Sequence, residues 1–403
     1  MTLADFGWAI VRIAIMLGFL LSVLPVVIWL ERRALAWFQN RVGPNRLGPF
    51  GLLQPMADAV KLFFKEEIVP ASADRFIWAL APALSLFPAL VAAATIPWGP
   101  NRLLTPVADV DIGILYFLAM SSLAAYGVLL AGWSSNNKYS LLGGLRSSAQ
   151  VISYELGMGL ALATAVLAAG SFRMTTIVEM QAQPLWGVVP FLHNWLIFTP
   201  WGLIGGALFF VCMLAETNRA PFDLPEAESE LVAGYQTEYS SMKFAAFFMG
   251  EYIAILAICG VMTTCFLGGY LAPINWSPIQ ALGEGGGFWG IVATLTGALM
   301  PPLWFIGKLF GLFFSFLWIR ATLLRLRYDQ LMNIGWRFLI PVGLVNLALL
   351  TVYVIWGWVP ALVGYALAIA VYFIVFGVRR PERRTVALLS EAQPYRPKEA
   401  QSG

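Results

Sequence analysis

The sequence predicts an all-α polytopic membrane protein, and three observations support this fold class. Of the 403 residues, 59% are hydrophobic and 12% are charged, whereas a soluble domain has about 25% charged residues. Apolar runs of about 20 residues, the length that crosses a bilayer as a helix, recur along the chain. The Lys and Arg residues gather in alternate polar segments between those runs. A soluble domain is therefore not expected in this chain.

The apolar runs predict nine transmembrane helices. We place them near residues 8–30, 76–98, 112–133, 150–169, 195–214, 242–267, 288–318, 337–359 and 361–378. The first run lacks the charged n-region and the cleavage motif of a signal peptide, so we expect it to remain in the mature protein.

The distribution of cations predicts the orientation of these helices. With the N-terminus outside, the inner segments and the C-terminal tail hold 21 of the 25 Lys and Arg residues, and the outer loops hold Arg102 and Arg173. Positive charge is retained on the cytoplasmic side during insertion. The net charge of +3 follows from this topology and indicates no nucleic-acid partner.

An amphipathic helix is expected in the first inner loop, residues 31–74. In GLLQPMADAVKLFFKEE, residues 51–67, apolar side chains recur at helical spacing and polar ones share the other face. Such a helix lies at the membrane interface. It is either a surface anchor or the roof of an access route for a lipid-soluble ligand.

The next inner segment, SSNNKYSLLGGLRSSAQ, is predicted to be a polar loop before the fourth span. Glu155 follows about one turn inside that span. The short inner loop after the seventh span contains Arg320, Arg325 and Arg327, which we interpret mainly as topology anchors.

Acidic residues inside the apolar spans are the strongest functional signal. Charges in the bilayer are costly and usually serve function, and Glu155, Glu216 and Glu251 meet that description. The stretch AETNRAPFDLPEAESE, residues 215–230, places five acids beside the lone cation Arg219. It is either a solvated acidic loop or part of a chain of protonatable groups, because buried carboxylates can exchange protons near neutral pH.

Other ionisable and sulfur-containing residues narrow the chemistry. Arg12 and Lys308 lie within spans and need partners or an aqueous pocket, and the single histidine, His193, is expected as an interfacial side chain. The cysteines are expected to be buried thiols, since their spacing does not suit a metal or iron–sulfur site; they are Cys212, Cys259 and Cys265. Any electron transfer would therefore require redox cofactors on a partner.

Four stretches resemble the signature loops of the H-type membrane subunits of respiratory complex I, whose mitochondrial counterpart is NADH dehydrogenase subunit one. They are ERRALAWFQNRVGPNRLGPFGLLQPMADAVKLFFKEE, GWSSNNKYSLLGGLRSSAQVISYE, AETNRAPFDLPEAESELVAGYQTEYSSMKFAAFFMGEY and LWIRATLLRLRYDQLM. The resemblance runs from the first span to the eighth.

This resemblance implies a membrane subunit of a proton-translocating NADH:quinone oxidoreductase in a bacterial inner membrane, active only within the complex. The subunit would lie at the junction with the peripheral arm. Its implied partners are the quinone-site subunits of that arm, neighbouring small membrane subunits and membrane lipid. Quinone would be the substrate, flavin and iron–sulfur clusters would belong to partner subunits, and no cofactor or metal would be bound by this chain.

The resemblance also implies site residues, none of which is catalytic in itself. The quinone-chamber lining corresponds to Glu31, Arg32, Arg41, Asp58, Ala59, Phe248 and Met249. The proton path corresponds to Glu155, Glu216, Asp223, Glu226, Glu228, Glu230, Glu238 and Glu251, with Arg219 as the internal cation.

The C-terminal part exceeds the eight-helix core that the family implies. We expect a core over residues 1–359, an additional helix over 360–378 and a basic, disordered cytoplasmic tail over 379–403. Two other functions remain open: the homologous membrane subunit of an energy-converting hydrogenase, and a stand-alone carboxylate-based ion carrier. The well-matched first loop favours the quinone enzyme, whereas a carrier would leave that loop without a task.

Overall fold

The computed structural model describes residues 3–187, 189–223, 233–275 and 287–377. Three predicted proton-path residues, Glu226, Glu228 and Glu230, and the predicted tail 379–403 lie outside the described residues. The α-helices are α1 (Leu3–Phe38), α2 (Gln54–Phe64), α3 (Arg75–Ala92), α4 (Gly113–Ser134), α5 (Lys138–Ala169), α6 (Met174–Gln181), α7 (Pro200–Glu216), α9 (Ser241–Phe266), α11 (Gly287–Thr322), α12 (Tyr328–Ile334), α13 (Ile340–Trp356) and α14 (Trp358–Gly377).

Shorter elements connect these helices. The 3₁₀ turns are η1 (Pro49–Gly51), η2 (Ala93–Thr95), η3 (Leu196–Phe198) and η4 (Gly234–Gln236), and a π-helical turn, η6 (Gly335–Leu339), precedes α13. Strands β1 (Pro184–Leu185) and β2 (Val189–His193) form an antiparallel hairpin after α6.

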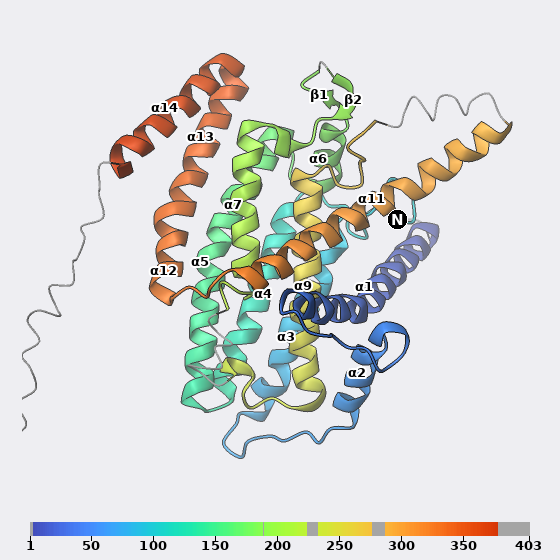
Figure 1. Ribbon diagram of the computed structural model, residues 1–403, viewed down its shortest axis with the longest axis vertical. Coiled ribbons are helices and arrows are strands. Elements are labelled where there is room, and N and C mark those ends of the chain that lie inside the picture. The colour runs from blue at the N-terminus through green and yellow to red at the C-terminus, as the bar shows by residue number, and fades with distance from the viewer. Residues whose placement is uncertain (1–2, 188, 224–232, 276–286, 378–403) are drawn as a thin grey trace, which may run out of the picture. The chain divides into compact units, whose positions relative to one another are not determined.

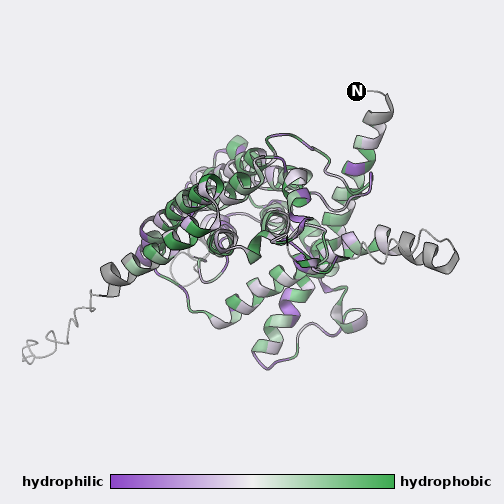
Figure 2. Cartoon of the chain, turned by 90° about the horizontal axis from the view of Figure 1, so that it is seen from above, coloured by the Kyte–Doolittle hydropathy of each residue, from purple (hydrophilic) through white to green (hydrophobic). Residues whose placement is uncertain are grey.

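The all-α membrane fold is confirmed. Within the described residues, seven helices are long and apolar enough to cross a membrane, and two shorter apolar helices cover 200–216 and 358–368. Each of these nine apolar helices overlaps one of the nine predicted spans, although the two shorter ones fall below the length of a full crossing. Seen from above, hydrophobic residues cover most of the helical turns (Figure 2).

The chain divides into two compact units, Met1–Thr351 and Val352–Gly403. In the first unit, α3, α4, α5, α7 and α9 pack side by side, and α1 and α11 run obliquely across α9 (Figure 1). The close approach of α3 and α4 depends on Gly127, because a Cβ there would lie 2.7 Å from the backbone nitrogen of Ser85. Small residues at such contacts let membrane helices approach closely.

Two predicted loop segments are helical instead. The helix α1 continues eight residues beyond the predicted end of the first span, to Phe38, where Asn40 takes a left-handed conformation with φ of 52°. The residues ERRALAWF favour this extension because most of them are good helix formers. The helix α5 begins at Lys138 rather than near Gln150, since the Asn137 side chain caps it by accepting from the Tyr139 backbone N–H at 3.0 Å.

The predicted amphipathic helix is present as α2. Its apolar side chains are exposed, with Phe64 81% and Phe63 65% accessible. The loop after α2 reaches the start of α9, where Lys243 Nζ lies 2.5 Å from Glu67 Oε1. The placement of this helix at a membrane interface stays a prediction.

Candidate functional site

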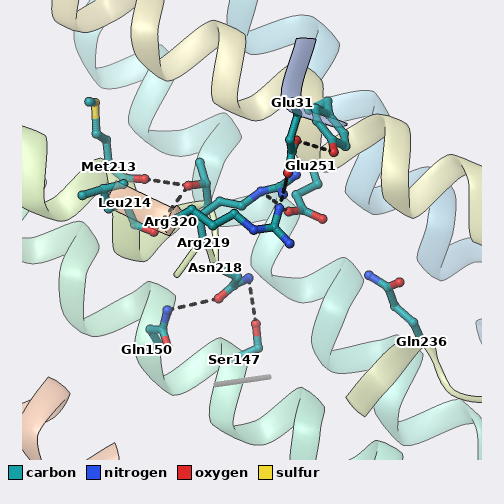
Figure 3. A network of polar contacts seen from close by, with 12 residues as sticks. Glu31, Ser147, Gln150, Met213, Leu214, Asn218, Arg219, Gln236, Glu251 and Arg320 are labelled. Carbon is teal, nitrogen blue, oxygen red and sulfur yellow. Dashed lines mark hydrogen bonds and ion pairs between the residues drawn. The ribbon is translucent and has the colours of Figure 1, made fainter. Parts of the chain in front are cut away.

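Arg219 lies between two carboxylates from different helices. It follows the end of α7, and its Nη1 donates to Oε1 of Glu31, on α1, at 2.9 Å. Its Nε lies 2.8 Å from Oε1 of Glu251, on α9, as an ion pair rather than a directed hydrogen bond. Figure 3 shows these three side chains converging.

Two further groups complete this arrangement. Arg320, on α11, also donates to Oε1 of Glu31, and the Tyr252 hydroxyl donates to Oε2 of the same carboxylate at 2.6 Å. The Tyr252 ring also faces the Arg219 guanidinium, 4.6 Å from its centroid, in a cation–π contact. We call Glu31, Arg219, Glu251, Tyr252 and Arg320 the ion cluster.

The ion cluster is electrically balanced and largely removed from solvent. Its two guanidiniums face two carboxylates, and the side chains of Glu31, Arg219 and Glu251 are only 5%, 11% and 13% exposed. Because removing one partner of a buried pair leaves an uncompensated charge, Glu31, Arg219 and Glu251 depend on one another, whereas the Arg320 side chain is 36% exposed. The interpretation of Arg320 as mainly a topology anchor was therefore incomplete, since its side chain belongs to this cluster.

The helix α5 positions the loop that contains Arg219. The Gln150 amide nitrogen donates to the backbone oxygens of Ala215 and Phe222, both at 2.8 Å. It also reaches Asn218 Oδ1 at 3.2 Å, and the Asn218 amide donates to Ser147 Oγ at 3.2 Å (Figure 3). Gln150 thus hydrogen-bonds to both ends of the segment from Ala215 to Phe222. No motif in the sequence indicates this role.

Acids of the predicted proton path gather at a pocket beside the ion cluster. The pocket is lined by Glu216 and Glu251 together with Ser121 and Tyr235. Glu216 Oε2 is buried and has no hydrogen-bond partner among the described residues. Glu155 lies next to this lining, because Ser121 Oγ donates to its Oε1 at 3.2 Å and Ser122 donates to the same oxygen.

Two other predicted path residues have different surroundings. Glu238 Oε1 accepts a hydrogen bond from the Asn137 amide at 2.7 Å, near the start of α5. Asp223 is the last described residue before the gap, and its backbone oxygen accepts from Arg325. The Glu238 carboxylate thus lies near the start of α5, and the Asp223 backbone lies near the segment that follows α11.

The predicted chamber residues are only partly brought together. Arg32 Nη1 and Asp58 Oδ2 form an ion pair of 2.5 Å between α1 and α2. Ala59 follows Asp58 on α2 and is exposed. On α9, Phe248 is half-buried and its ring lies 4.8 Å from that of Tyr252. Its neighbour Met249 is also half-buried.

Arg41 stands apart from the other chamber residues. Its side chain is exposed and donates to Gln39 Oε1 at 2.7 Å. The ion cluster instead joins Glu31, from the predicted chamber, to Arg219 and Glu251, from the predicted path. The structure thus links two sets of residues that are separate in the sequence-based prediction.

The cysteine expectation is confirmed, whereas the placement of His193 at a membrane interface stays a prediction. Cys212, Cys259 and Cys265 are buried free thiols. His193 is 9% exposed, and its Nδ1 lies 2.6 Å from the backbone oxygen of Ala272. Burial lowers the pKa of His193, so its ring favours the neutral form.

Comparison with known proteins gives one family. A family model described as NADH dehydrogenase matches residues 10–351. The NADH-quinone oxidoreductase H subunit 1 of Geobacter metallireducens is 44% identical over 361 residues, which is 88% of this chain and 97% of the relative. NADH-quinone oxidoreductase subunit 8 of Rhodothermus marinus is 45% identical over 343 residues, 85% of this chain and 96% of the relative.

A third relative agrees with these two. The NADH-quinone oxidoreductase H subunit of Rickettsia bellii is 49% identical over 314 residues, covering 78% of this chain and 84% of the relative. The family match includes every residue of the ion cluster. The chain therefore belongs to the NADH dehydrogenase family.

Proposed function

We propose that the chain is the H-type membrane subunit of a proton-translocating NADH:quinone oxidoreductase. The names of its relatives and its apolar helices support this function. The single observation that favours a coupling role is the position of Arg219, which is shared between Glu31 and Glu251. One cation thus connects a residue of the proposed quinone chamber with a residue of the proposed proton path.

The proposed quinone chamber is bounded by α1, α2 and α9. An isoprenoid tail needs an apolar surface and its headgroup needs a few placed polar groups. The exposed apolar face of α2 and half-buried Phe248 and Met249 would supply the apolar surface for the tail. The ion pair of Arg32 and Asp58, with Arg41 and Ala59 nearby in sequence, would border the headgroup.

The proposed proton path begins where the chamber meets the ion cluster. If a negative charge develops on the chamber side, it competes with Glu251 for Arg219. Glu251 then needs another source of compensation, and a proton is the simplest one. The unpaired oxygen of Glu216 lies in the same pocket as Glu251 and would be the next group to exchange that proton.

The remaining proposed path residues extend this route along the acidic segment. Glu155 joins through Ser121, which lines the pocket. Asp223, Glu226, Glu228, Glu230 and Glu238 are assigned by resemblance, and three of them lie outside the described residues.

The rest of the enzyme would be supplied by other subunits. Flavin and iron–sulfur clusters would be held by the peripheral arm, while quinone and membrane lipid would contact this chain. We propose a bacterial inner-membrane location with the N-terminus outside and the acidic segment in the cytoplasm, as the cation distribution favours. Residues 1–359 would form the core, 360–378 a further lipid-facing helix and 379–403 a cytoplasmic tail; the family match, which ends at residue 351, supports a boundary in this region.

The competing functions have less support. The relatives are named for quinone rather than for hydrogen, so a hydrogenase subunit is the second candidate. A stand-alone carrier has less support because the relatives are named as subunits of a larger enzyme.

The test is purification through a tag on this chain in mild detergent, followed by measurement of NADH-driven quinone reduction and proton pumping. We expect activity with the parent chain, and a parallel loss of both activities in Glu216→Gln and Glu228→Gln although the complex assembles. Glu179→Gln, an exposed acid on α6, is the matched control. Coupled turnover at the parent rate in both path variants would exclude the proposed path, and a lone chain that conducts ions would exclude the whole function.

A further inference from the structure

Lys308 links α11 to the end of α9. Its ammonium group donates to three backbone oxygens, those of Leu267 and Leu271 at 2.6 Å and that of Gly269 at 2.9 Å. An ammonium has three N–H donors, so all of them are used. The same group lies 4.1 Å from the Trp195 ring centroid, which adds a cation–π contact.

The turn after α9 is shaped to receive this cation. Gly268 and Gly269 both have positive φ, 75° and 55°, and a Cβ on Gly268 would lie 2.4 Å from the Trp195 ring. Glycine therefore lets the chain fold back so that alternate carbonyls converge on one point. The carbonyl end of a helix also favours a positive charge.

The partners of Lys308 do not titrate. They are backbone carbonyls and an aromatic ring, and none of the described ion pairs includes Lys308. These contacts therefore do not require an ionised carboxylate as a partner. They can hold the two helices together while charges in the ion cluster change.

The same two helices supply three members of the ion cluster. Arg320 lies twelve residues after Lys308 on α11, which is about 18 Å along a helix. Glu251 and Tyr252 lie earlier on α9, which ends at Phe266. A slip of α11 by one residue would move Arg320 by about 1.5 Å and turn it by about 100°, so it would lose Glu31.

We infer that Lys308 is a positioning residue that fixes α11 against the end of α9 and thereby holds Arg320 on Glu31. This inference deepens the proposed function and rests on it. It assigns a task to a charged residue inside an apolar span for which the quinone chamber and the proton path have no use.

The test is a double-variant cycle in the assembled complex. The variants are Lys308→Met, Arg320→Gln and the pair together, with quinone reduction and pumping as readouts. Each single variant is expected to lower turnover by about tenfold or more, since small misplacements far from the chemistry have such effects. The pair is expected to be no slower than the slower single variant, because coupled residues are not additive.

A charge-conserving variant and a control complete the design. Lys308→Arg keeps the cation but not the three converging donors, so it should recover part of the turnover lost in Lys308→Met. Arg12→Met removes a different cation from an apolar span, one that donates to the backbone oxygen of Pro106, and should keep parent turnover. If Lys308→Met does not assemble, the same cycle is run with Lys308→Arg.

The outcomes separate the inference from the proposed function. Losses that multiply in the pair would show that Lys308 only stabilises the fold, which overturns the inference. A slow Arg320→Gln beside a normal Lys308→Met overturns the inference alone. Full turnover in Arg320→Gln would remove the role of the ion cluster and the inference with it, whereas non-additive losses with partial recovery in Lys308→Arg support both.

Discussion

Arg219 and Arg173 both bind carboxylates, and their surroundings differ. Arg173 forms a bidentate pair with Asp109, in which Nε donates to Oδ1 at 2.9 Å and Nη2 donates to Oδ2 at 2.5 Å. Arg219 binds Glu31 and Glu251 through single contacts of 2.9 and 2.8 Å. The Arg173 side chain is 41% exposed, whereas that of Arg219 is 11% exposed.

This difference teaches that burial, rather than contact geometry, decides which ion pair is costly to disrupt. By geometry alone the Arg173 pair is the better one, since two parallel N–H···O bonds are the stronger form. Exposed pairs nevertheless contribute little because water already solvates both charges. A buried pair is costly to disrupt because the remaining charge has no solvent to replace its partner.

The largest effect is expected from removing the shared cation. Arg219→Gln leaves Glu31 with the Arg320 guanidinium and the Tyr252 hydroxyl, and takes away the guanidinium that lies 2.8 Å from Glu251, so the subunit should lose roughly 3–5 kcal/mol of stability. The measurement is the thermal unfolding of the purified complex, with quinone reduction measured in parallel. Arg173→Gln is the matched control, and equal losses in the two variants would contradict the importance of burial.

A second substitution sharpens that result. Adding Glu251→Gln to Arg219→Gln removes one of the stranded charges, so part of the lost stability should return. It should not restore pumping, because the proposed path would still lack Glu251. Recovered pumping in this pair would argue against Glu251 as a proton carrier.

Much of the fold follows from local sequence signals, as α2 illustrates. Its apolar residues recur at helical spacing, and the helix forms over 54–64 within the predicted range. The start of α5 was missed because the segment before Gln150 is polar. That segment is helical because Asn137 caps it and because Gly143 lets the helix approach Gly234, where a Cβ would lie 2.8 Å from the Gly234 Cα.

The candidate site could be predicted in composition but not in its connections. Intramembrane acids such as Glu251 are visible in one sequence because charges in lipid are rare. Arg320 is not distinguishable in that way, since a cation after a span is also the ordinary signal of topology. Its contact with Glu31 joins residues 289 positions apart, and only the packing of α11 across α1 and α9 creates it.

A moderate effect is expected at the ion pair between α1 and α2. Asp58→Asn removes the charge that binds Arg32, whose side chain is 43% exposed. The apparent quinone affinity should change by at most about fivefold, the range of an exposed pair, without a change in thermal unfolding. Ala59→Phe should alter inhibitor sensitivity, because the larger side chain would occupy space beside Asp58 in the proposed chamber. Lys61→Gln on α2 is the control. Unchanged quinone kinetics in Asp58→Asn and Ala59→Phe would count against a chamber at α2.

The smallest effect is expected at Asp109, where pH provides the test. The Arg173 guanidinium holds the pKa of Asp109 below its usual range, so the pair adds stability when the carboxylate is ionised in both states. That contribution is complete above the unfolded pKa, near 3.9, and is lost as the pH falls through the lower folded value. Because the pair is exposed, the stability difference between the parent and Asp109→Asn should be below about 1 kcal/mol.

This difference should also be constant between pH 7 and pH 5, because both pKa values of Asp109 lie below that window. Thermal unfolding of the purified complex at several pH values measures it, and raising the salt concentration should reduce it because the pair is exposed to screening ions. Thr175→Val removes the hydroxyl that donates to Asp109 Oδ1 at 3.1 Å and separates the neutral contact from the ionic one. A difference that shrinks between pH 7 and pH 5 would mean that another titrating group controls this side of the molecule. A difference as large as that of Arg219→Gln would mean that the exposed pair is buried in the assembled enzyme.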